Sequence, residues 1–463
     1  GRELVANDVI YSWKRLADPA NTSEAYFVID GKIKGLSDWA IKKSKGQATY
    51  ETPVEGLVAR DSHTLVVTLE KPYHQLSNVV AMPSMAIVPR EAVEMFGAEF
   101  LNHPVGTGPF MLAKKEDWIR NSKISLVKNP KFRDETFPGD SGKKLPLVDK
   151  LVFHELPEEQ PRWQTGLKGG YDWFDIPSDS FEAAIDSGTL SPELAGKGMK
   201  VDVSPAMDVT YVGINMMDPV LGKSKLVRQA MSLAFDSEDY IKRFMNGRGI
   251  KAHSPVPPGL AVYDPKFRNP LAEHNLLRAK KLLADAGYPE GKGLPEFEYE
   301  SLADTKGRQQ GEYFAQSMAK IGIRIRINSN SWPQLLTKLK ERKATLFGLG
   351  WGAVYPDPQA FFMAFYSKNI SPGPNATNFV NAEFDRLYEK SLTLKDSPAR
   401  DAVYRELRDF ITDQAVWIHV SHRLNYRVLH GWVDNFKWSE IALSYPKYIG
   451  VDVKKREQLS KAL

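Results

Sequence analysis

The sequence predicts a chain of α/β and α+β lobes built on mixed β-sheets. Segments with strand and helix periodicity alternate along the chain, but without the regular βαβ repeat of a purely parallel sheet. The 463 residues exceed what one hydrophobic core usually supports, and they are enough for two or three domains. Internal repeats, low-complexity segments and long flexible linkers are all missing from the sequence. We therefore expect lobes that are joined by a hinge.

The first part of the chain predicts short helices and strands separated by turns. A helix is expected near the start, with Asn7 or Asp8 as its N-cap. Alternating β-branched residues predict a strand within residues 61–72, and residues 150–157 are expected to form a buried strand. A helix in between should end at Gly97, because glycine favours the position just after a helix.

The second part of the chain has clearer periodicity. Residues 209–216 predict a strand, and residues 321–332 alternate between isoleucine and arginine as expected for a strand with two different faces. Apolar residues at helical spacing predict two long helices. Their predicted buried stripes are Val227, Ala230, Met231 and Ala234 in the first, and Val403, Leu407, Phe410 and Ile411 in the second.

Composition excludes several classes of protein. The net charge is only +5, and the short basic runs at residues 42–45 and 453–457 are typical of solvated faces, so no nucleic-acid partner is expected. The chain has no cysteine, which removes disulfides and thiolate chemistry and suits an oxidising compartment. No apolar run has the length of a membrane span.

The sequence contains no complete catalytic or cofactor-binding motif. Met217 stands where a phosphate-binding loop ending in Gly222 and Lys223 would need glycine. Asp172 and Asp175 could form an acid/base pair, but a turn acid and a strand-edge acid are the favoured interpretation. The nine histidines are scattered and form no metal-binding pattern. We therefore expect no enzyme activity, no cofactor and no metal.

Aromatic residues are abundant, with 10 Trp, 18 Tyr and 22 Phe. Trp332 follows a predicted strand, and Trp351 and Tyr355 lie in the glycine- and proline-rich run GLGWGAVYPDPQAFF at residues 348–362. Aromatic side chains on turns at strand ends often line concave binding sites, because they offer rigid faces with few torsions to restrict. Packing at the rim or in the core is the open alternative.

Several segments together resemble the family 5 extracellular solute-binding proteins, the oligopeptide- and dipeptide-binding components of ABC importers. They occur in the order that the family shows. They are ELVANDVIYSWKRLADP, HTLVVTLEKPY, VGTGPFML, LVKNPKF, GGYDWFDIP, YVGINMMDPVLGKSKLVRQAMSLAFD, AKKLLADAGYPEG, WGAVYPDP and NFVNAEFDRLYEKS.

The resemblance implies a two-lobed periplasmic-binding-protein fold, of type II and cluster C-like, with an extra inserted subdomain. Two crossing strands join the lobes, and hinge closure engulfs the ligand. It places residues 1–105 in the inserted subdomain, residues 106–205 and 442–463 in the first lobe, and residues 206–441 in the second lobe. The family carries a further segment before residue 1. We therefore expect that the N-terminal part of the fold is missing from this sequence, or that another chain supplies it.

Val354 marks a departure from the peptide-binding members. They carry an aspartate at this place, which pairs with the α-ammonium of the peptide, and a buried ammonium without a counter-charge is costly. Oligopeptide-type members also tend to carry arginines where this chain has Leu339 and Gly348. Asp357 could substitute for the missing aspartate, although capping of its Pro-Asp-Pro turn is the favoured role.

The candidate ligand-binding residues follow from this comparison. Trp332, Trp351 and Tyr355 are expected to wall in the ligand, and Tyr26 is a candidate from the opposite side. The remaining candidates are Gly350 and Gly352, which would let the backbone approach the ligand, together with Val354 and Asp357.

The preferred hypothesis is a periplasmic or extracellular, cell-envelope-associated binding protein that delivers a peptide-like or other small organic ligand to an ABC permease. A binding fold recruited as a non-transport subunit is the first alternative. A nickel-chelate-binding protein is the second, because such relatives share the W-G-A-x-Y run. Those relatives carry a histidine in the following loop, whereas residues 361–378 contain none.

Overall fold

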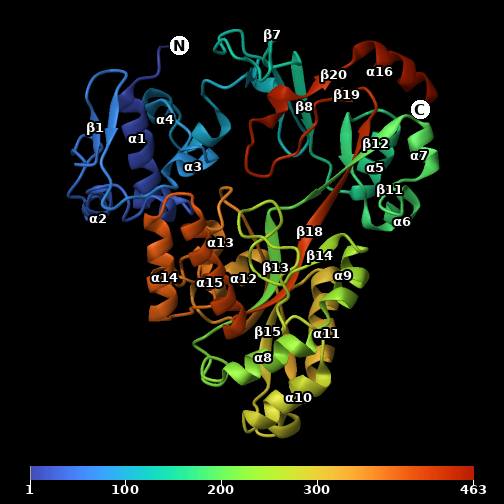
Figure 1. Cartoon of the computed structure of the whole chain (residues 1–463). Coiled ribbons are helices and arrows are strands. Elements are labelled where there is room, and N and C mark those ends of the chain that lie inside the picture. Colours follow the sequence, from blue (N-terminus) through green and yellow to red (C-terminus); the bar gives the residue numbers. More distant parts are fainter. Residues whose placement is uncertain (1) are drawn as a thin grey trace. The chain divides into compact units, whose positions relative to one another are not determined.

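The structure of the protein is a computed structural model that describes residues 2–463. The chain forms two compact units (Figure 1). Unit 1 comprises Gly1–Phe174 and His430–Leu463, and unit 2 comprises Asp175–Leu429. The chain therefore passes between the units twice, within strands β9 (Trp173–Asp175) and β18 (Trp417–His430). The predicted residue bounds of the inserted subdomain and of the two lobes stay a prediction.

Unit 1 contains short elements. Its helices are α1 (Ala6–Ala17), α2 (Leu36–Ser44), α3 (Leu76–Val80), α4 (Arg90–Phe96), α5 (Glu159–Leu167) and α16 (Val453–Leu459). Its strands, besides β9, are β1 (Leu57–Ala59), β2 (Leu65–Val67), β3 (Phe110–Met111), β4 (Trp118–Ile119), β5 (Lys123–Lys128), β6 (Thr136–Phe137), β7 (Asp140–Lys144), β8 (Lys150–His154), β19 (Val433–Asp434) and β20 (Gly450–Val451).

Unit 2 is built from longer elements. Its helices are α6 (Phe181–Ala184), α7 (Pro192–Gly196), α8 (Lys225–Ala234), α9 (Ser237–Met245), α10 (Leu276–Asp285), α11 (Thr305–Ala319), α12 (Trp332–Lys340), α13 (Gln359–Phe362), α14 (Ala382–Thr393) and α15 (Pro398–Gln414). Its strands, besides β18, are β10 (Ile185–Asp186), β11 (Thr189–Leu190), β12 (Met199–Pro205), β13 (Asp208–Ile214), β14 (Gly249–Lys251), β15 (Phe297–Leu302), β16 (Ile325–Asn330) and β17 (Leu346–Gly352).

A mixed sheet organises unit 2. The strand order is β12-β18-β13-β17-β15-β16, and β14 and β9 also pair with β18. Strand β13 is antiparallel to both of its neighbours, whereas β15 is parallel to both β16 and β17. The predicted mixed sheet is therefore confirmed. Because β13 and β17 are antiparallel, the amino end of β13 lies beside the carboxyl end of β17, with Asp208 opposite Gly352.

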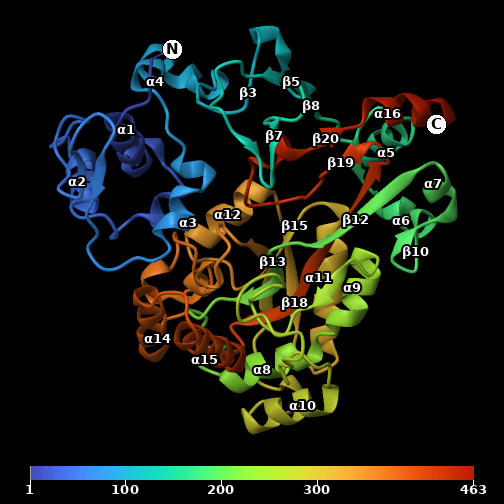
Figure 2. The same ribbon diagram turned by 45° about the horizontal axis from the view of Figure 1, so that its top comes forward.

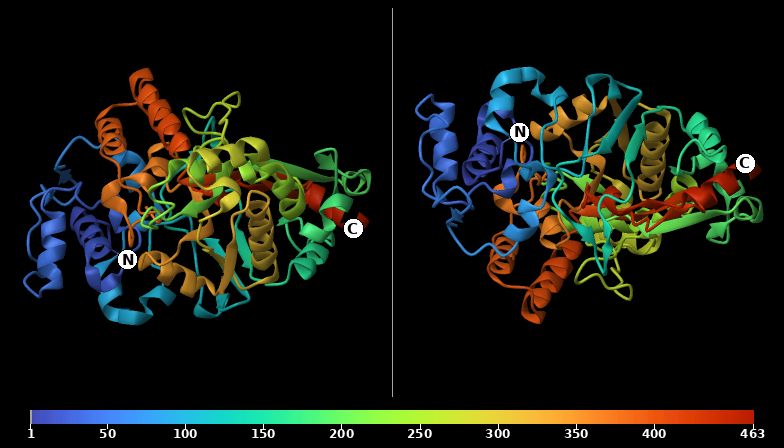
Figure 3. Two further views of the ribbon diagram at one scale, coloured as in Figure 1. Left: turned by 90° about the horizontal axis from the view of Figure 1, so that it is seen from below. Right: turned by 90° about the horizontal axis from the view of Figure 1, so that it is seen from above.

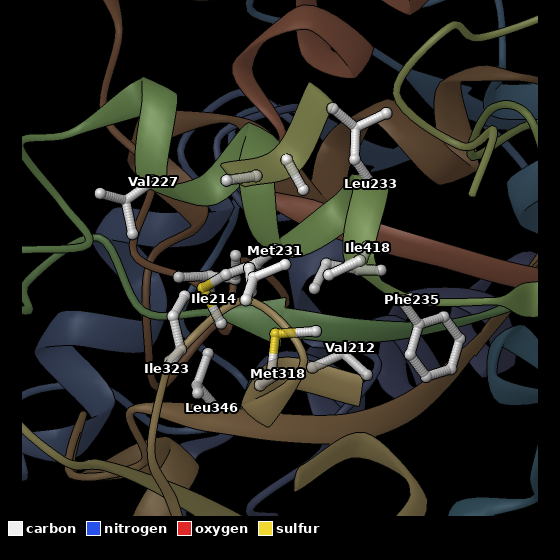
Figure 4. Packing of buried hydrophobic residues seen from close by; sticks show 14 of the residues in the cluster. Val212, Ile214, Val227, Met231, Leu233, Phe235, Met318, Ile323, Leu346 and Ile418 are labelled. Atoms are coloured by element: carbon white, nitrogen blue, oxygen red, sulfur yellow. The ribbon is translucent and has the colours of Figure 1, made fainter. Parts of the chain in front are cut away.

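One face of this sheet carries the main hydrophobic core of unit 2. Val212 and Ile214 of β13 pack there with Met231 of α8, Met318 of α11 and other apolar side chains (Figure 4). The predicted stripe of α8 is confirmed, since all four of its residues are fully buried. Helices α8 and α10 lie side by side in two views (Figures 1 and 2). Burying this stripe, more than helix propensity, stabilises α8.

Aromatic side chains gather on the other side of the strands. Tyr211 of β13 stacks on Trp417 of β18, with ring centroids 3.6 Å apart, and Phe365 packs against the same tryptophan. The orange helices α14 and α15 remain side by side when the molecule is turned (Figure 3). In α15, Val403, Leu407 and Ile411 of the predicted stripe are buried and Phe410 is half-buried.

Two local predictions in unit 1 are wrong. Strand β8 exists, but only Leu151 is buried, because the strand pairs with β5 alone among the described residues and Val152 and Phe153 remain exposed. Helix α1 is capped by Val5 instead of Asn7 or Asp8. Asp8 is the third helical residue, where its carboxylate accepts a hydrogen bond of 2.8 Å from the backbone N–H of Val5.

Candidate functional site

A cavity of about 300 Å³ lies within unit 2, near the carboxyl ends of β15 and β17. Its walls come from β13, β15, β17, α9 and α11, and the first residue of α12 lies at the same cavity. Cavities at the carboxyl ends of strands are common ligand sites, since loops and helix ends bring polar groups there. This cavity is our candidate functional site.

Alternation of small and large residues along β17 helps to form the cavity. Successive side chains of a strand point to opposite faces, so the glycines of GLGWG share one face and the large residues share the other. Gly348 and Gly350 line the cavity. A Cβ atom at Gly348 would lie 2.5 Å from the hydroxyl oxygen of Tyr299, which is too close without a shift. The missing side chain at Gly348 therefore leaves room for the phenol.

Aromatic rings form the inner wall. Tyr299 of β15 stacks on Phe314 of α11 with centroids 4.9 Å apart, and it is 6% exposed. Tyr240 of α9 packs against Phe235 at 5.5 Å. Burial raises the pKa of both tyrosines, so both remain protonated and can donate a hydrogen bond at neutral pH. Trp332, at the start of α12, is 50% exposed and also lines the cavity.

The one carboxylate among the lining residues is already satisfied. Glu300 is 1% exposed, and its oxygens accept hydrogen bonds from three neighbours. The donors are Lys338 Nζ at 2.7 Å, Asn330 Nδ2 at 2.6 Å and Asn328 Nδ2 at 3.1 Å. Because a buried carboxylate needs such partners, Glu300 has little capacity left for a ligand.

A second acid beside the cavity is also paired. Arg423, which lines the cavity, forms an ion pair with the buried carboxylate of Asp208. Its backbone N–H donates to the same carboxylate at 3.2 Å. The Arg423 side chain is 54% exposed, which leaves part of its guanidinium open to solvent.

The structure brings only some of the predicted site residues to this cavity. Trp332 and Gly350 line it. Trp351 lies on the opposite face of β17, where its indole N–H donates to the carbonyl of Ala360 at 2.7 Å. Gly352 ends the strand and is exposed.

The loop after β17 carries three further predicted residues, and none of them lines this cavity. Val354 is half-buried, whereas Tyr355 is 1% exposed. Asp357 is 6% exposed and forms a buried ion pair with Arg400, at 2.8 Å from both carboxylate oxygens. The Asp357 carboxylate also accepts from the Tyr404 hydroxyl at 3.0 Å and caps its turn through the backbone N–H of Gln359 at 2.8 Å.

Tyr26 belongs to unit 1 and lies in a short 3₁₀ turn, Tyr26–Val28. Its ring is half-buried, and its hydroxyl lies 3.4 Å from the hydroxyl of Ser37. Burial raises the pKa of Tyr26 to about 12. Its predicted contact with a ligand stays a prediction.

A second cavity of unit 2, of about 370 Å³, has a different character. Its charged groups pair largely with one another, since the Lys251 ammonium lies 3.2 Å from Glu238 and 3.0 Å from Glu273. His422 contributes to its wall and donates from Nδ1 to the backbone carbonyl of Asp208 at 2.7 Å. Strand β18 therefore places His422 at this cavity and the next residue, Arg423, at the candidate site.

We expect the free energy of unfolding to fall as the pH is lowered from about 6.5 towards 4. Burial lowers the pKa of His422 to about 4 and that of His419 to about 3. Between these values and the ordinary value of about 6.5, the unfolded chain binds protons that the folded chain does not. The loss should approach about 1.4 kcal/mol per pH unit for each histidine.

Urea unfolding at pH 7, 6 and 5 measures this dependence. The exposed His63, whose side chain is 63% accessible, provides the control variant His63→Gln, which should keep the slope. Equal unfolding free energies at pH 7 and pH 5 would contradict the neutral, buried state of His419 and His422.

No group of three or more metal-ligating side chains suited to a metal ion occurs within the described part of the chain. Among the helices of residues 2–463, none is both long enough and apolar enough to cross a membrane.

Sequence reasoning missed most of the cavity wall. Tyr240, Tyr299, Lys306, Gln310 and Arg423 line the cavity, but none was a candidate. A tyrosine that alternates with charged residues in a strand such as FEYESL has the sequence pattern of a core residue. The available signal was the alternation of glycine with large residues in GLGWG, which leaves one face of the strand without side chains.

Comparisons with known proteins agree with this architecture. The structure of the ABC transporter-associated periplasmic binding protein DppA from Helicobacter pylori, in complex with the peptide STSA, superposes with a TM-score of 0.74. The alignment covers 97% of this chain and 82% of that one at 22% sequence identity. The predicted two-lobed periplasmic-binding-protein fold is therefore confirmed.

The sequence profile of the bacterial extracellular solute-binding proteins, family 5, matches residues 1–373. The chain belongs to this family, as the resemblance predicted, and the family consists of non-enzymatic transport proteins. The periplasmic oligopeptide-binding protein OppA of Salmonella typhimurium is 25% identical over 446 residues, covering 94% of this chain and 76% of OppA. Heme-binding protein A of Haemophilus influenzae is 25% identical over 460 residues, covering 98% and 77%.

Proposed function

We propose that the protein is the ligand-capturing component of an ABC importer in the bacterial cell envelope. Membership of family 5 supports this proposal, and the related OppA, 76% of which the alignment covers, is a periplasmic oligopeptide-binding protein by name. The two lobes close over the ligand by hinge motion, and the closed form delivers the ligand to a membrane permease. The described residues offer no observation in favour of a recruited non-transport subunit or a nickel-chelate binder.

The cavity at β15 and β17 holds at least part of the ligand. Trp332 and Gly350 contact the ligand there. The Trp332 indole is exposed at the cavity, and Gly350 has no side chain that would separate the ligand from the backbone of β17. The ligand is peptide-like or another small organic molecule. The related proteins include binders of oligopeptides and of heme by name, so the fold accommodates both kinds of ligand.

The ligand is not a free peptide held by its α-ammonium. The observation that carries this inference is that, among the described residues, the carboxylate that lines the cavity and the one in the loop after β17 are both paired. Val354 provides none, Asp357 is paired with Arg400, and Glu300 is paired with Lys338. A buried ammonium without a counter-charge costs several kcal/mol.

Isothermal titration calorimetry with a library of di- and tripeptides tests this function. We expect weak or no binding for peptides with free N-termini, and tighter binding for members of the same library whose N-terminus is acetylated. Nanomolar binding of the free peptides, with acetylation abolishing it, would show that an ammonium partner exists.

A further inference from the structure

Tyr299 presents a hydroxyl that no described group satisfies. The residue is 94% buried, and its hydroxyl oxygen lies where a Cβ atom of Gly348 would be only 2.5 Å away. Both residues line the cavity, and no hydrogen bond contributes to the raised pKa of the phenol. A phenol without a protein partner keeps its O–H free to donate, so this hydroxyl has an unused capacity to donate into the cavity.

Three further donors face the same space. The Tyr240 hydroxyl also has no hydrogen-bond partner among residues 2–463, and Tyr299 is close enough to influence its pKa. Lys306 and Gln310, both on α11, line the cavity and form no ion pair or side-chain hydrogen bond within the described chain. The Lys306 side chain is exposed, so its ammonium can reach an incoming group.

The acceptors of the cavity are occupied, in contrast to these donors. Glu300 accepts from Lys338 and two asparagines, as described above. Thr210 Oγ1 lies 2.7 Å from Ser421 Oγ, and the Ser301 hydroxyl donates to the carbonyl of Gly307 at 2.6 Å. The free capacity of the cavity is thus made of donors and of the positive charge of Lys306, together with the part of the Arg423 guanidinium that its pair with Asp208 leaves open to solvent.

We propose that the cavity recognises its ligand by an anionic, acceptor-bearing group of the carboxylate class, seated against Tyr299, Tyr240 and Lys306. This inference rests on the proposed function and specifies which end of the ligand is read. Hydrogen bonds from phenols and an ammonium to a carboxylate are charge-assisted and stronger than neutral ones. The protein therefore recognises a carboxylate at one end of its ligand instead of an α-ammonium.

The apolar residues that line the cavity also indicate what kind of group adjoins the carboxylate of the ligand. Phe235, Phe314 and the thioether of Met245 surround the phenols, and Trp332 adds an exposed ring. An aryl or acyl group adjacent to the carboxylate fits these apolar surfaces, since aromatic faces and sulfur pack well against such groups. A volume of about 300 Å³ limits this part of the ligand to a small group.

A panel of matched compounds tests the ligand class. Each member supplies one aryl or acyl body as a free acid, as its neutral amide and as a primary amine; N-acetyl-phenylalanine, N-acetyl-phenylalaninamide and phenylalaninamide form one such set. Thermal shift identifies binders, and calorimetry at pH 7 measures affinity. We expect binding to be confined to acids, with the matching amides at least about tenfold weaker. Binding of amines, or no binding by any acid, overturns the proposal.

Variants locate the recognised group. Tyr299→Phe should weaken binding of the best acid about tenfold or more and leave its amide within about twofold, because a hydrogen bond to a charged group is worth more than one to a neutral group. Tyr288→Phe, a tyrosine outside the cavity, is the control. Lys306→Gln should weaken the acid, whereas Lys320→Gln at the other end of α11 should not. Equal losses for acid and amide would overturn the assignment.

The failures of the two proposals are distinguishable. If native mass spectrometry finds a bound ligand of another class while no acid binds, the solute-binding function stands and the carboxylate proposal falls. If neither a copurified ligand nor any member of the panel or the peptide library binds, both fall. Melting temperatures of the variants without ligand separate a binding defect from misfolding.

Discussion

Replacing Asp357 by alanine is expected to lower the free energy of unfolding by about 3–5 kcal/mol. The substitution leaves the Arg400 guanidinium, which is 3% exposed, without its buried counter-charge. It also removes the acceptor of the Tyr404 hydroxyl and the cap of the following turn. An isolated buried charge is far more costly than an isolated surface charge. Urea unfolding at pH 7 measures the loss.

The same arginine provides the matched control. Arg400 also pairs with Asp396, whose side chain is 92% exposed. Asp396→Ala should change stability by no more than about 1 kcal/mol, because solvent screens this pair. Equal effects of the two substitutions, or a loss below about 1 kcal/mol for Asp357→Ala, would contradict a structural role. A folded Asp357→Ala variant that keeps its stability and loses only ligand affinity would show that Asp357 is a ligand-binding residue.

Gly348→Leu is expected to weaken ligand binding by about a hundredfold or more, equal to about 2.7 kcal/mol at 25 °C. A side chain at this position occupies the cavity and meets the Tyr299 hydroxyl, so the ligand and the phenol cannot both keep their places. Calorimetry with the tightest-binding acid of the panel measures the effect. Gly348→Ala should show a smaller loss, because its methyl group needs only a modest shift of the ring.

A glycine outside the cavity gives the control for this variant. Gly196, the last residue of α7, does not line the cavity and would meet no atom within 4 Å of an added Cβ. Gly196→Leu should leave affinity within about threefold. If Gly348→Leu binds as tightly as the unchanged protein, the ligand does not enter this cavity.

Periodicity was sufficient to predict elements whose burial follows from their own sequence. The stripe of α8 is an example, because Val227, Ala230, Met231 and Ala234 must share one face of any helix that contains them. Strand β16, which lies within predicted residues 321–332, follows in the same way, whereas Trp332 begins helix α12 instead of lying on a turn. The ordered segments of the family then supplied the fold, which local patterns leave open.

Local sequence patterns could not predict the burial of residues whose environment is set by another strand or helix. Strand β8 has an apolar sequence, but its exposure is decided by which strands and helices cover it. The pair of Asp357 and Arg400 joins positions 43 residues apart, so a turn sequence alone shows only a capping acid. Likewise, the unsatisfied hydroxyl of Tyr299 exists only because β15 and β17 are neighbours.

The central claim is that unit 2 captures a small organic ligand through an acidic group and without an ammonium partner. Native mass spectrometry of the protein, purified without denaturation from its own organism, tests this claim most directly, with release and identification of the bound molecule. We expect an acid with an aryl or acyl body and no free α-ammonium. A bound peptide with a free N-terminus, released in stoichiometric amount, would contradict it.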